Sequence, residues 1–144
     1  MRRLALVVAA ALVLAGCGGS SNQSTTNSAA AAQAQIRSAY QKFFSGQTPV
    51  SDRVAVLQNG PRFQALVKSF ASNPLAKNVR VTVSSVTLQG ANNAKVVYTV
   101  KLGGAGLPKQ TGTAVMQNGT WKVGFASLCK LVALQGSTPS VCKS

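Results

Sequence analysis

The segment Val79–Leu102 reads VRVTVSSVTLQGANNAKVVYTVKL and decides the fold, because apolar and polar residues alternate along most of it. Such alternation is typical of a strand with one buried face. The alternation slips by one position at Ser84-Ser85, which predicts a bulge, and Ala91-Asn92-Asn93 predicts a turn. The segment therefore predicts two paired strands. The second of them, residues 94–102, has the clearest strand pattern in the chain.

Two further strands are expected on the C-terminal side of this pair. Residues 103–108 contain three glycines and one proline and predict a loop, and residues 111–116 predict a third strand. Asn118-Gly119 is a strong hairpin signal. It precedes a fourth strand, whose inner face is expected to carry three apolar residues: Trp121, Val123 and Phe125.

Helices are expected on the N-terminal side, where the apolar period changes to 3.6. Five apolar residues follow the i, i+3, i+4, i+7, i+8 pattern of an amphipathic helix that ends at Gly46: Ile36, Ala39, Tyr40, Phe43 and Phe44. Asp52 is expected to cap a short helical turn that runs to Leu57. Pro61 begins another helix, with a stripe at Phe63, Leu66, Val67 and Phe70.

This order of elements predicts the fold class. Helices followed by an antiparallel meander predict an α+β domain, with N-terminal helices packed on a curved four-stranded antiparallel sheet.

The first residues are typical of an export signal. Arg2-Arg3 precede the apolar run Leu4–Leu14, and Leu14-Ala15-Gly16-Cys17 resembles the bacterial lipobox, in which the cysteine is acylated. Two or three acyl chains make a stable membrane anchor. We therefore expect a lipoprotein signal peptide at residues 1–16, an acylated Cys17 and flexible polar tether at residues 17–32, and a single α+β domain at residues 33–144.

The amino-acid composition excludes most classes of enzymatic reaction. The chain of 144 residues has 15 Lys and Arg, one Asp, no Glu and no His, for a formal charge of +14. General acid-base catalysis needs a carboxylate or imidazole with a suitable pKa, and Asp52 is interpreted as a helix cap or surface ion pair. Metal sites need ligands that this chain lacks. We expect no enzyme activity, no catalytic residue, no metal and no cofactor.

The two remaining cysteines, Cys129 and Cys142, are expected to form a disulfide, because export places them in an oxidising compartment. The closed loop would stabilise the fold by about 3 kcal/mol in the chain-entropy view. A redox-active pair is the alternative, but the spacing is not CxxC.

The segments IRSAYQKFFSG, DRVAVLQNG, AKVVYTV, NGTWKV and FASLCKLVALQGSTPSVC resemble the actinobacterial low-molecular-weight secreted antigen family. This resemblance covers about three quarters of the chain, and its most specific parts are residues 119–123 and the Cys129/Cys142 pair. It implies a cystatin-like, nuclear-transport-factor-two-like cone, in which helices back onto a curved sheet. It implies no catalytic residues.

These observations favour a non-enzymatic, lipid-anchored envelope protein whose cationic domain associates with anionic envelope components, with binding of an apolar ligand as the alternative. Four cationic residues occupy outward strand positions and could bind anionic lipids or phosphorylated envelope glycans: Arg80, Lys95, Lys101 and Lys122. Solubility alone is the alternative role for this charge. The second function is binding of a small apolar ligand in a pocket lined by aromatic residues that otherwise fill the core: Tyr40, Phe44, Tyr98, Trp121 and Phe125.

The export signal and the lipobox-like segment predict that the protein is located in the cell envelope. The expected location is the extracytoplasmic face of the membrane, reached through acylated Cys17, with shedding as an alternative. Nucleic acid is not expected as a partner, because the chain lacks the basic pattern interleaved with aromatic residues. The sequence names no protein partner.

Overall fold

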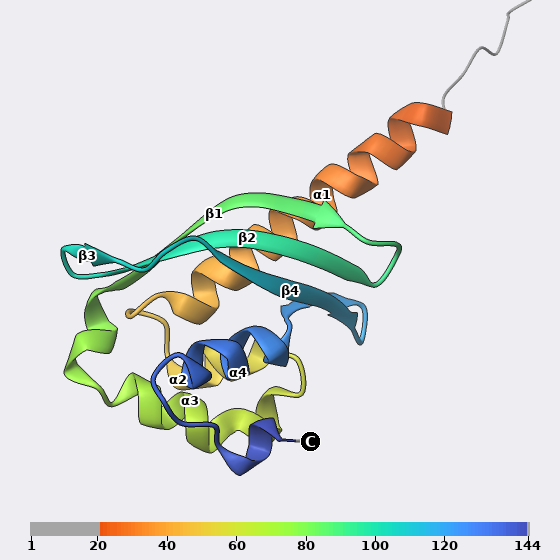
Figure 1. Ribbon diagram of the computed structural model, residues 1–144. Helices are drawn as coiled ribbons and strands as arrows, with labels where there is room; N and C mark the ends of the chain where they lie inside the picture. Colours follow the sequence, from red (N-terminus) through yellow and green to blue (C-terminus); the bar gives the residue numbers. More distant parts are fainter. Residues whose placement is uncertain (1–20, 144) are drawn as a thin grey trace, which may run out of the picture.

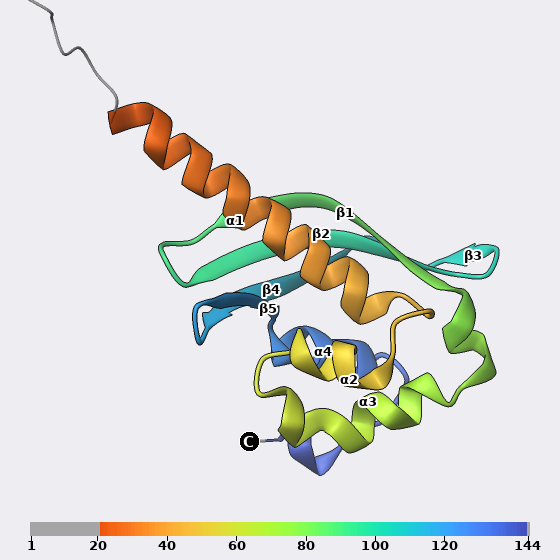
Figure 2. The ribbon, with the colours of Figure 1, turned by 180° about the vertical axis from the view of Figure 1, so that it is seen from behind.

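One long helix lies diagonally across a curved antiparallel sheet in the computed structural model, which describes residues 21–143 (Figures 1 and 2). This helix, α1, spans Ser21–Phe44 and packs against strands β1 and β5. The predicted apolar stripe is its buried face: Ile36, Ala39, Tyr40 and Phe43 are buried, and Phe44 is half-buried. The amphipathic pattern therefore predicted correctly which side of the helix meets the sheet.

The start of α1 differs from the expectation. The helix begins at Ser21, inside the range 17–32 that we expected to be a flexible polar tether, so the backbone of residues 21–32 is helical. Ala29–Ala32 have the highest intrinsic helix propensity and extend the packed helix towards the N-terminus. Thr25–Ser28 are exposed, and the first turns project past the sheet (Figure 2). Residues 1–20, which include the predicted signal peptide and Cys17, lie outside the described residues.

The sheet has the order β1-β2-β4-β5, with all pairs antiparallel. These strands span Val79–Leu88, Asn93–Leu102, Gln110–Gln117 and Thr120–Val123. The register of β1 against β2 shifts between Val83 and Ser85, which confirms the predicted bulge. A two-residue strand, β3 (Ala105–Gly106), pairs with the end of β2 inside the segment that we expected to be a loop.

The remaining helices gather beyond one side of the sheet (Figure 1). After α1 come α2 (Val50–Ala55), the 3-10 turn η1 (Gly60–Phe63), α3 (Gln64–Ala71) and the 3-10 turn η2 (Pro74–Asn78). After β5 come α4 (Phe125–Ala133) and η3 (Ser140–Cys142). The prediction of helices packed on a curved antiparallel sheet is confirmed, and α4 is an additional element.

The fourth strand is shorter than predicted. β5 ends at Val123, and Phe125 begins α4, so the placement of Phe125 on the inner face of that strand is wrong. Gly124 explains the change of direction, because a Cβ atom built there would collide with Thr113 of β4. The backbone can approach β4 this closely only at a glycine, and the chain then leaves the sheet as a helix.

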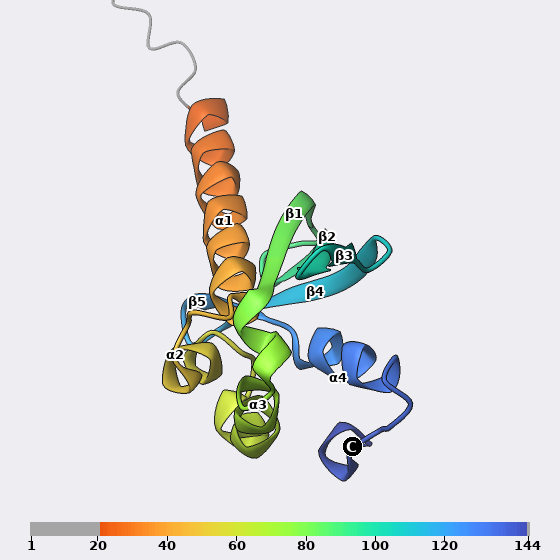
Figure 3. The ribbon, with the colours of Figure 1, turned by 90° about the vertical axis from the view of Figure 1, so that its left-hand side faces the viewer.

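The core is formed by residues from Ala32 to Cys142. The segment from residue 21 onward therefore contains every described side chain of this core. None of the helices within residues 21–143 has both the length and the apolar character that a membrane crossing requires. Among the described elements, none covers the outer face of the sheet, the face turned away from α1 (Figure 3).

Candidate functional site: an apolar pocket at the end of the sheet

An apolar pocket with a cavity volume of about 430 Å³ lies where the paired ends of β1 and β2 meet the helices. Its walls come from the end of α1, from α2, α3 and η2, from the segment after β3, and from α4. This volume falls in the range of about 300 to 1,000 Å³ that is typical of small-molecule sites. Most of the lining is aliphatic or aromatic, and Arg53 is the one charged residue among the described residues that line it.

The mouth of the pocket is surrounded by exposed large apolar side chains. Four large apolar side chains are exposed among the described residues, and all four line this pocket. These residues, here called the mouth leucines, are Leu75, Leu102, Leu107 and Leu134, with exposed fractions of 57%, 40%, 45% and 61%. They come from η2, the end of β2, the segment after β3 and the residue after α4. Their convergence from four separate segments makes the mouth the candidate interaction site of the described residues.

Arg53 is buried on α2, with 7% of its surface exposed. Its Nε donates a hydrogen bond to the carbonyl oxygen of Thr48 at 2.9 Å, and its Nη2 donates to the carbonyl oxygen of Ser45 at 2.7 Å. Burial disfavours the charged form and lowers the pKa of Arg53. Because Ser45 directly follows α1, its carbonyl lies at the negative end of the helix dipole and offsets part of the desolvation.

Of the five aromatic residues predicted to line a pocket, Phe44 lines this one. Tyr40 and Tyr98 instead fill the core, with ring centroids 5.1 Å apart, and Phe44 packs on Tyr98 at 5.4 Å. Burial raises the pKa of Tyr98 to about 12 and raises the pKa of Tyr40 well above its usual range. These two tyrosines do not line the pocket, and both contact its lining residue Phe44.

The other two aromatic residues lie elsewhere. Phe125 stacks on Phe63 with ring centroids 5.5 Å apart, between α4 and η1. Trp121 is buried and lines a second hollow, of about 420 Å³, beside the exposed turns of α1. The five aromatic residues therefore do not line a single pocket.

The four predicted cationic residues lie on the outer face of the sheet, where their strand positions alternate with buried ones. Arg80 and Lys101 are direct cross-strand partners. Lys122 on β5 pairs with Val115 on β4, and Val115 in turn pairs with Asn93 on β2. Asn93 is two residues from Lys95, so Lys122 and Lys95 lie at the same end of the sheet. Lys95 and Lys101 are six positions apart along β2, which is about 20 Å of strand. The cations thus form two groups, and Arg80/Lys101 is the closer pair.

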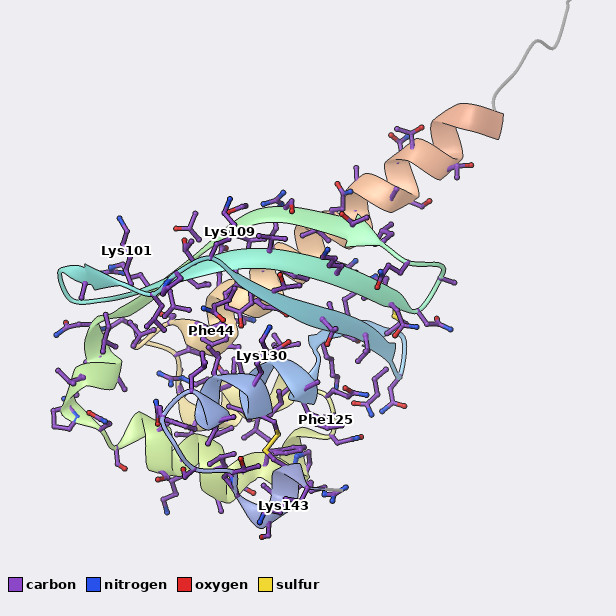
Figure 4. All side chains as sticks on the ribbon, in the orientation of Figure 1. Phe44, Lys101, Lys109, Phe125, Lys130 and Lys143 are labelled. Carbon is purple, nitrogen blue, oxygen red and sulfur yellow. A yellow bond between two sulfur atoms is a disulfide. The ribbon has the colours of Figure 1, made fainter. Side chains whose placement is uncertain are left out.

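The Arg80/Lys101 pair lies at the same end of the sheet as the pocket. The next residues along the strands, Val79 and Leu102, are paired and line the pocket from the opposite face. Lys101 projects near β3 in Figure 4, and Lys130 projects from α4.

The two remaining predictions concern Asp52 and the cysteines. Asp52 does not cap α2: Pro49 occupies the N-cap position, and the exposed Asp52 carboxylate accepts a hydrogen bond from Ser51 Oγ at 3.4 Å. Pro49 fixes the chain direction ahead of the helix, so Asp52 falls in its first turn. Cys129 and Cys142 form the expected disulfide, with Cα atoms 5.6 Å apart, which ties η3 to α4 (Figure 4).

Sequence reasoning missed the mouth leucines as a group and Arg53. Leu75 and Leu107 belong to no periodic stripe, and Leu102 follows the alternation that predicts a buried position. Apolar side chains isolated in polar loops were the available signal. For Arg53 the sequence offered no signal, because arginine is seldom buried without an acidic partner.

The comparisons with known proteins address fold and family. None of the curated proteins compared with the chain matches it. A solved domain of unknown function with a cystatin-like fold from Nostoc punctiforme is 11% identical, with 87% of this chain and 92% of that chain covered and a TM-score of 0.36. A family match covers residues 29–139 and confirms the resemblance seen in the sequence, so the chain belongs to the family described as low molecular weight antigen MTB12, C-terminal domain.

Proposed function

We propose that the domain binds an apolar small molecule in the pocket, without a catalytic step, and that an acyl anchor on Cys17 holds the protein at the extracytoplasmic face of the membrane. The observation that carries the proposal is the convergence of the mouth leucines on one cavity. Their exposed carbon surface gains free energy when a ligand removes it from water, at about 25 cal/mol per Å².

The surroundings of the pocket support a small molecule as the occupant. Its walls are packed elements of the core, including Phe43, Val67, Val100 and Leu128, which are all buried. A pocket with rigid walls binds with little loss of conformational entropy. The mouth leucines, by contrast, stand at the rim and can cover a ligand that has entered.

Uptake of a neutral fluorescent probe, N-phenyl-1-naphthylamine, by the domain of residues 21–144 tests the proposal. The double substitution Leu75→Gln with Leu134→Gln removes apolar area from the rim. At about 1 kcal/mol per side chain, it should weaken probe binding by roughly tenfold or more. Both side chains are more than half exposed, so the fold should be unaffected.

A matched control is available on the outer face of the sheet. Val97 and Val115 are half-buried there and do not line the pocket. The double substitution Val97→Gln with Val115→Gln should leave probe binding unchanged. Absence of probe binding by the unmodified domain, or equal losses in the two double variants, would contradict the proposed function.

A second function, association with an anionic envelope surface, is favoured by the placement of Arg80 directly opposite Lys101. Like charges at directly opposed positions destabilise a sheet. The sequence contains no Glu and only one Asp, which lies on α2, so no acidic side chain of the sheet offsets this pair. An external polyanion, such as a phospholipid headgroup layer or a phosphorylated glycan, would do so.

A further inference from the structure

We infer that the ligand of the pocket is an amphipathic anion, a single aliphatic chain ending in a carboxylate, and that the guanidinium of Arg53 binds its head group. The inference rests on the proposed apolar-ligand function and adds the chemical class of the ligand. It is carried by the placement of one buried cation in the wall of a mostly apolar cavity, whose other polar lining residues, Asn73 and Gln135, are uncharged.

The hydrogen bonds of Arg53 leave part of its guanidinium available. A guanidinium has five N–H donors, and Arg53 uses one on Nε and one on Nη2 for the carbonyl oxygens of Thr48 and Ser45. Nη1 has no acceptor among the described residues. No side-chain nitrogen of the described residues is both buried and unpaired, so Nη1 is accessible rather than enclosed by the core.

The charge of Arg53 also lacks a counter-charge within the protein sequence. Asp52 is the only acidic side chain in the chain, and it is exposed and bonded to Ser51. Carbonyl oxygens carry only partial charge, so they compensate incompletely for the desolvation of a buried cation. An anionic ligand in the same pocket would supply the missing charge.

A carboxylate fits this position better than other anions of similar size. The two carbonyl oxygens hold the guanidinium in a fixed orientation, and a planar carboxylate can accept from its remaining N–H groups in the fork geometry that arginine favours. The aliphatic chain then lies against the apolar walls and passes the mouth leucines. A cavity of about 430 Å³ lies in the lower part of the range for ligand sites, which favours one chain over two.

Displacement of the neutral naphthylamine probe from the domain of residues 21–144 tests the inference, with dodecanoate and dodecanol as competitors. The two competitors share a chain and differ in the head group. Dodecanoate should bind about ten- to a hundredfold more tightly than dodecanol, the range expected for a charge-assisted hydrogen-bonded pair. Within a series of carboxylates, affinity should rise about fourfold per added CH₂ until the pocket is full.

Arg53→Gln should lower the affinity for dodecanoate to that for dodecanol, while the affinity for dodecanol changes by less than about threefold. The ratio of the two affinities is the readout, because partial unfolding would lower both equally. Lys68→Gln is the matched control: Lys68 is an exposed cation on α3, beside pocket-lining Val67, and does not line the pocket itself. It should leave the ratio unchanged.

The unmodified domain provides a second readout, which holds even where Arg53→Gln fails to fold. The Nε–H resonance of Arg53, measured by NMR, should shift on titration with dodecanoate and stay in place with dodecanol. Equal affinities for the two competitors would overturn the carboxylate inference, and so would an Arg53 resonance that does not shift on addition of dodecanoate. Either result would leave the proposed function unaffected. Failure of both competitors and of the probe to bind would overturn the proposed function itself.

Discussion

The hydroxyl of Tyr40 on α1 donates a hydrogen bond to the carbonyl oxygen of Thr113 on β4, with the two oxygens 2.7 Å apart. The same hydroxyl lies 3.1 Å from Ser127 Oγ on α4, which also accepts from the Thr113 amide at 2.9 Å. One buried network thus joins the long helix, the sheet and the helix that forms a pocket wall. A Cβ built on Gly112 would lie 2.5 Å from the Tyr40 hydroxyl oxygen, so only glycine fits beside this network.

Tyr40→Phe and Gly112→Ala should both destabilise the domain. The first removes hydrogen bonds of the Tyr40 hydroxyl and should cost about 1 kcal/mol. The second forces a methyl group against Tyr40 and Ser127 and should cost about 1 to 3 kcal/mol. Denaturant unfolding monitored by the fluorescence of Trp121, the one tryptophan, measures both changes.

The two substitutions should also be coupled. In the Tyr40→Phe background, the oxygen closest to the new methyl group is absent, so Gly112→Ala should cost at least about 0.5 kcal/mol less than in the original chain. Strict additivity in the double-mutant cycle would show that Tyr40 is not what excludes a side chain at position 112.

Stability should fall at alkaline pH because of the two buried tyrosines. In the unfolded chain a tyrosine ionises with a pKa of about 10, whereas the folded pKa of Tyr98 is about 12 and that of Tyr40 is also raised. Above pH 10 the unfolded state therefore binds fewer protons than the folded state, and the free energy of unfolding decreases as pH rises towards 12. Below pH 10 this stabilisation is fully present.

The measurement is the unfolding midpoint between about pH 9 and pH 12, together with tyrosinate absorbance. The sequence has only these two tyrosines, so the absorbance reports on them alone. Tyr98→Phe should flatten the alkaline decrease. Tyrosinate absorbance that develops at about pH 10 in the folded protein would mean that the two phenols are not shielded from water.

Removal of the disulfide should weaken both stability and ligand binding. Replacing Cys129 and Cys142 together by serine should cost about 3 kcal/mol in the chain-entropy view. Because Leu131, Leu134 and Gln135 line the pocket within the bridged loop, probe affinity should fall as well. Denaturant midpoints and probe titrations check this, and a thiol titration that finds both cysteines free after export would contradict the bridge itself.

Acylation of Cys17 should be detectable by metabolic labelling. The lipobox-like Leu14-Ala15-Gly16-Cys17 predicts a lipid label that Cys17→Ala abolishes, together with loss of the protein from the membrane fraction. Cys142→Ala is the matched control and should retain the label. Labelling that persists in Cys17→Ala would remove the anchor from the proposed function.

The outer face of the sheet should bind anionic vesicles in a salt-dependent manner. Replacing Arg80, Lys95, Lys101 and Lys122 by glutamine should weaken binding of the domain by about three orders of magnitude, at about 1 kcal/mol per cation. Binding should largely disappear at 1 M salt, where the Debye length is about 3 Å. Restoring Arg80 and Lys101 alone should recover more binding than restoring the other two, because they are adjacent.

Charge-matched replacement of four exposed lysines away from that face provides the control: Lys42, Lys68, Lys77 and Lys143. Equal losses in the two quadruple variants would show that net charge, and not the outer face, attracts the vesicles. Arg37 is unsuitable as a control, because its Nη1 donates to the carbonyl oxygen of Val83 at 2.7 Å and ties α1 to the bulged strand.

The sequence by itself determined the elements whose signals are local. The periods of 3.6 and 2 identified the buried faces of α1, β1 and β2, and the slip at Ser84-Ser85 located the bulge, because side-chain direction repeats with the backbone geometry. Asn118-Gly119 located its hairpin, where both residues adopt positive φ angles of 53° and 75°. The Cys129–Cys142 disulfide was predicted from the oxidising compartment that an exported protein meets. The absence of His and Glu restricted the possible reactions.

Only the tertiary structure decided the site. The mouth leucines come from η2, β2, the segment after β3 and the residue after α4, and nothing in their local sequences brings them together. Arg53 is buried because the turn from Ser45 to Thr48 offers it two carbonyl oxygens as hydrogen-bond acceptors. Ser45 is eight residues and Thr48 five residues before Arg53 in the sequence. Periodicity shows which side of an element is apolar. Whether apolar side chains meet partners or remain exposed around a cavity depends on how the separate elements pack, which is a property of the whole fold.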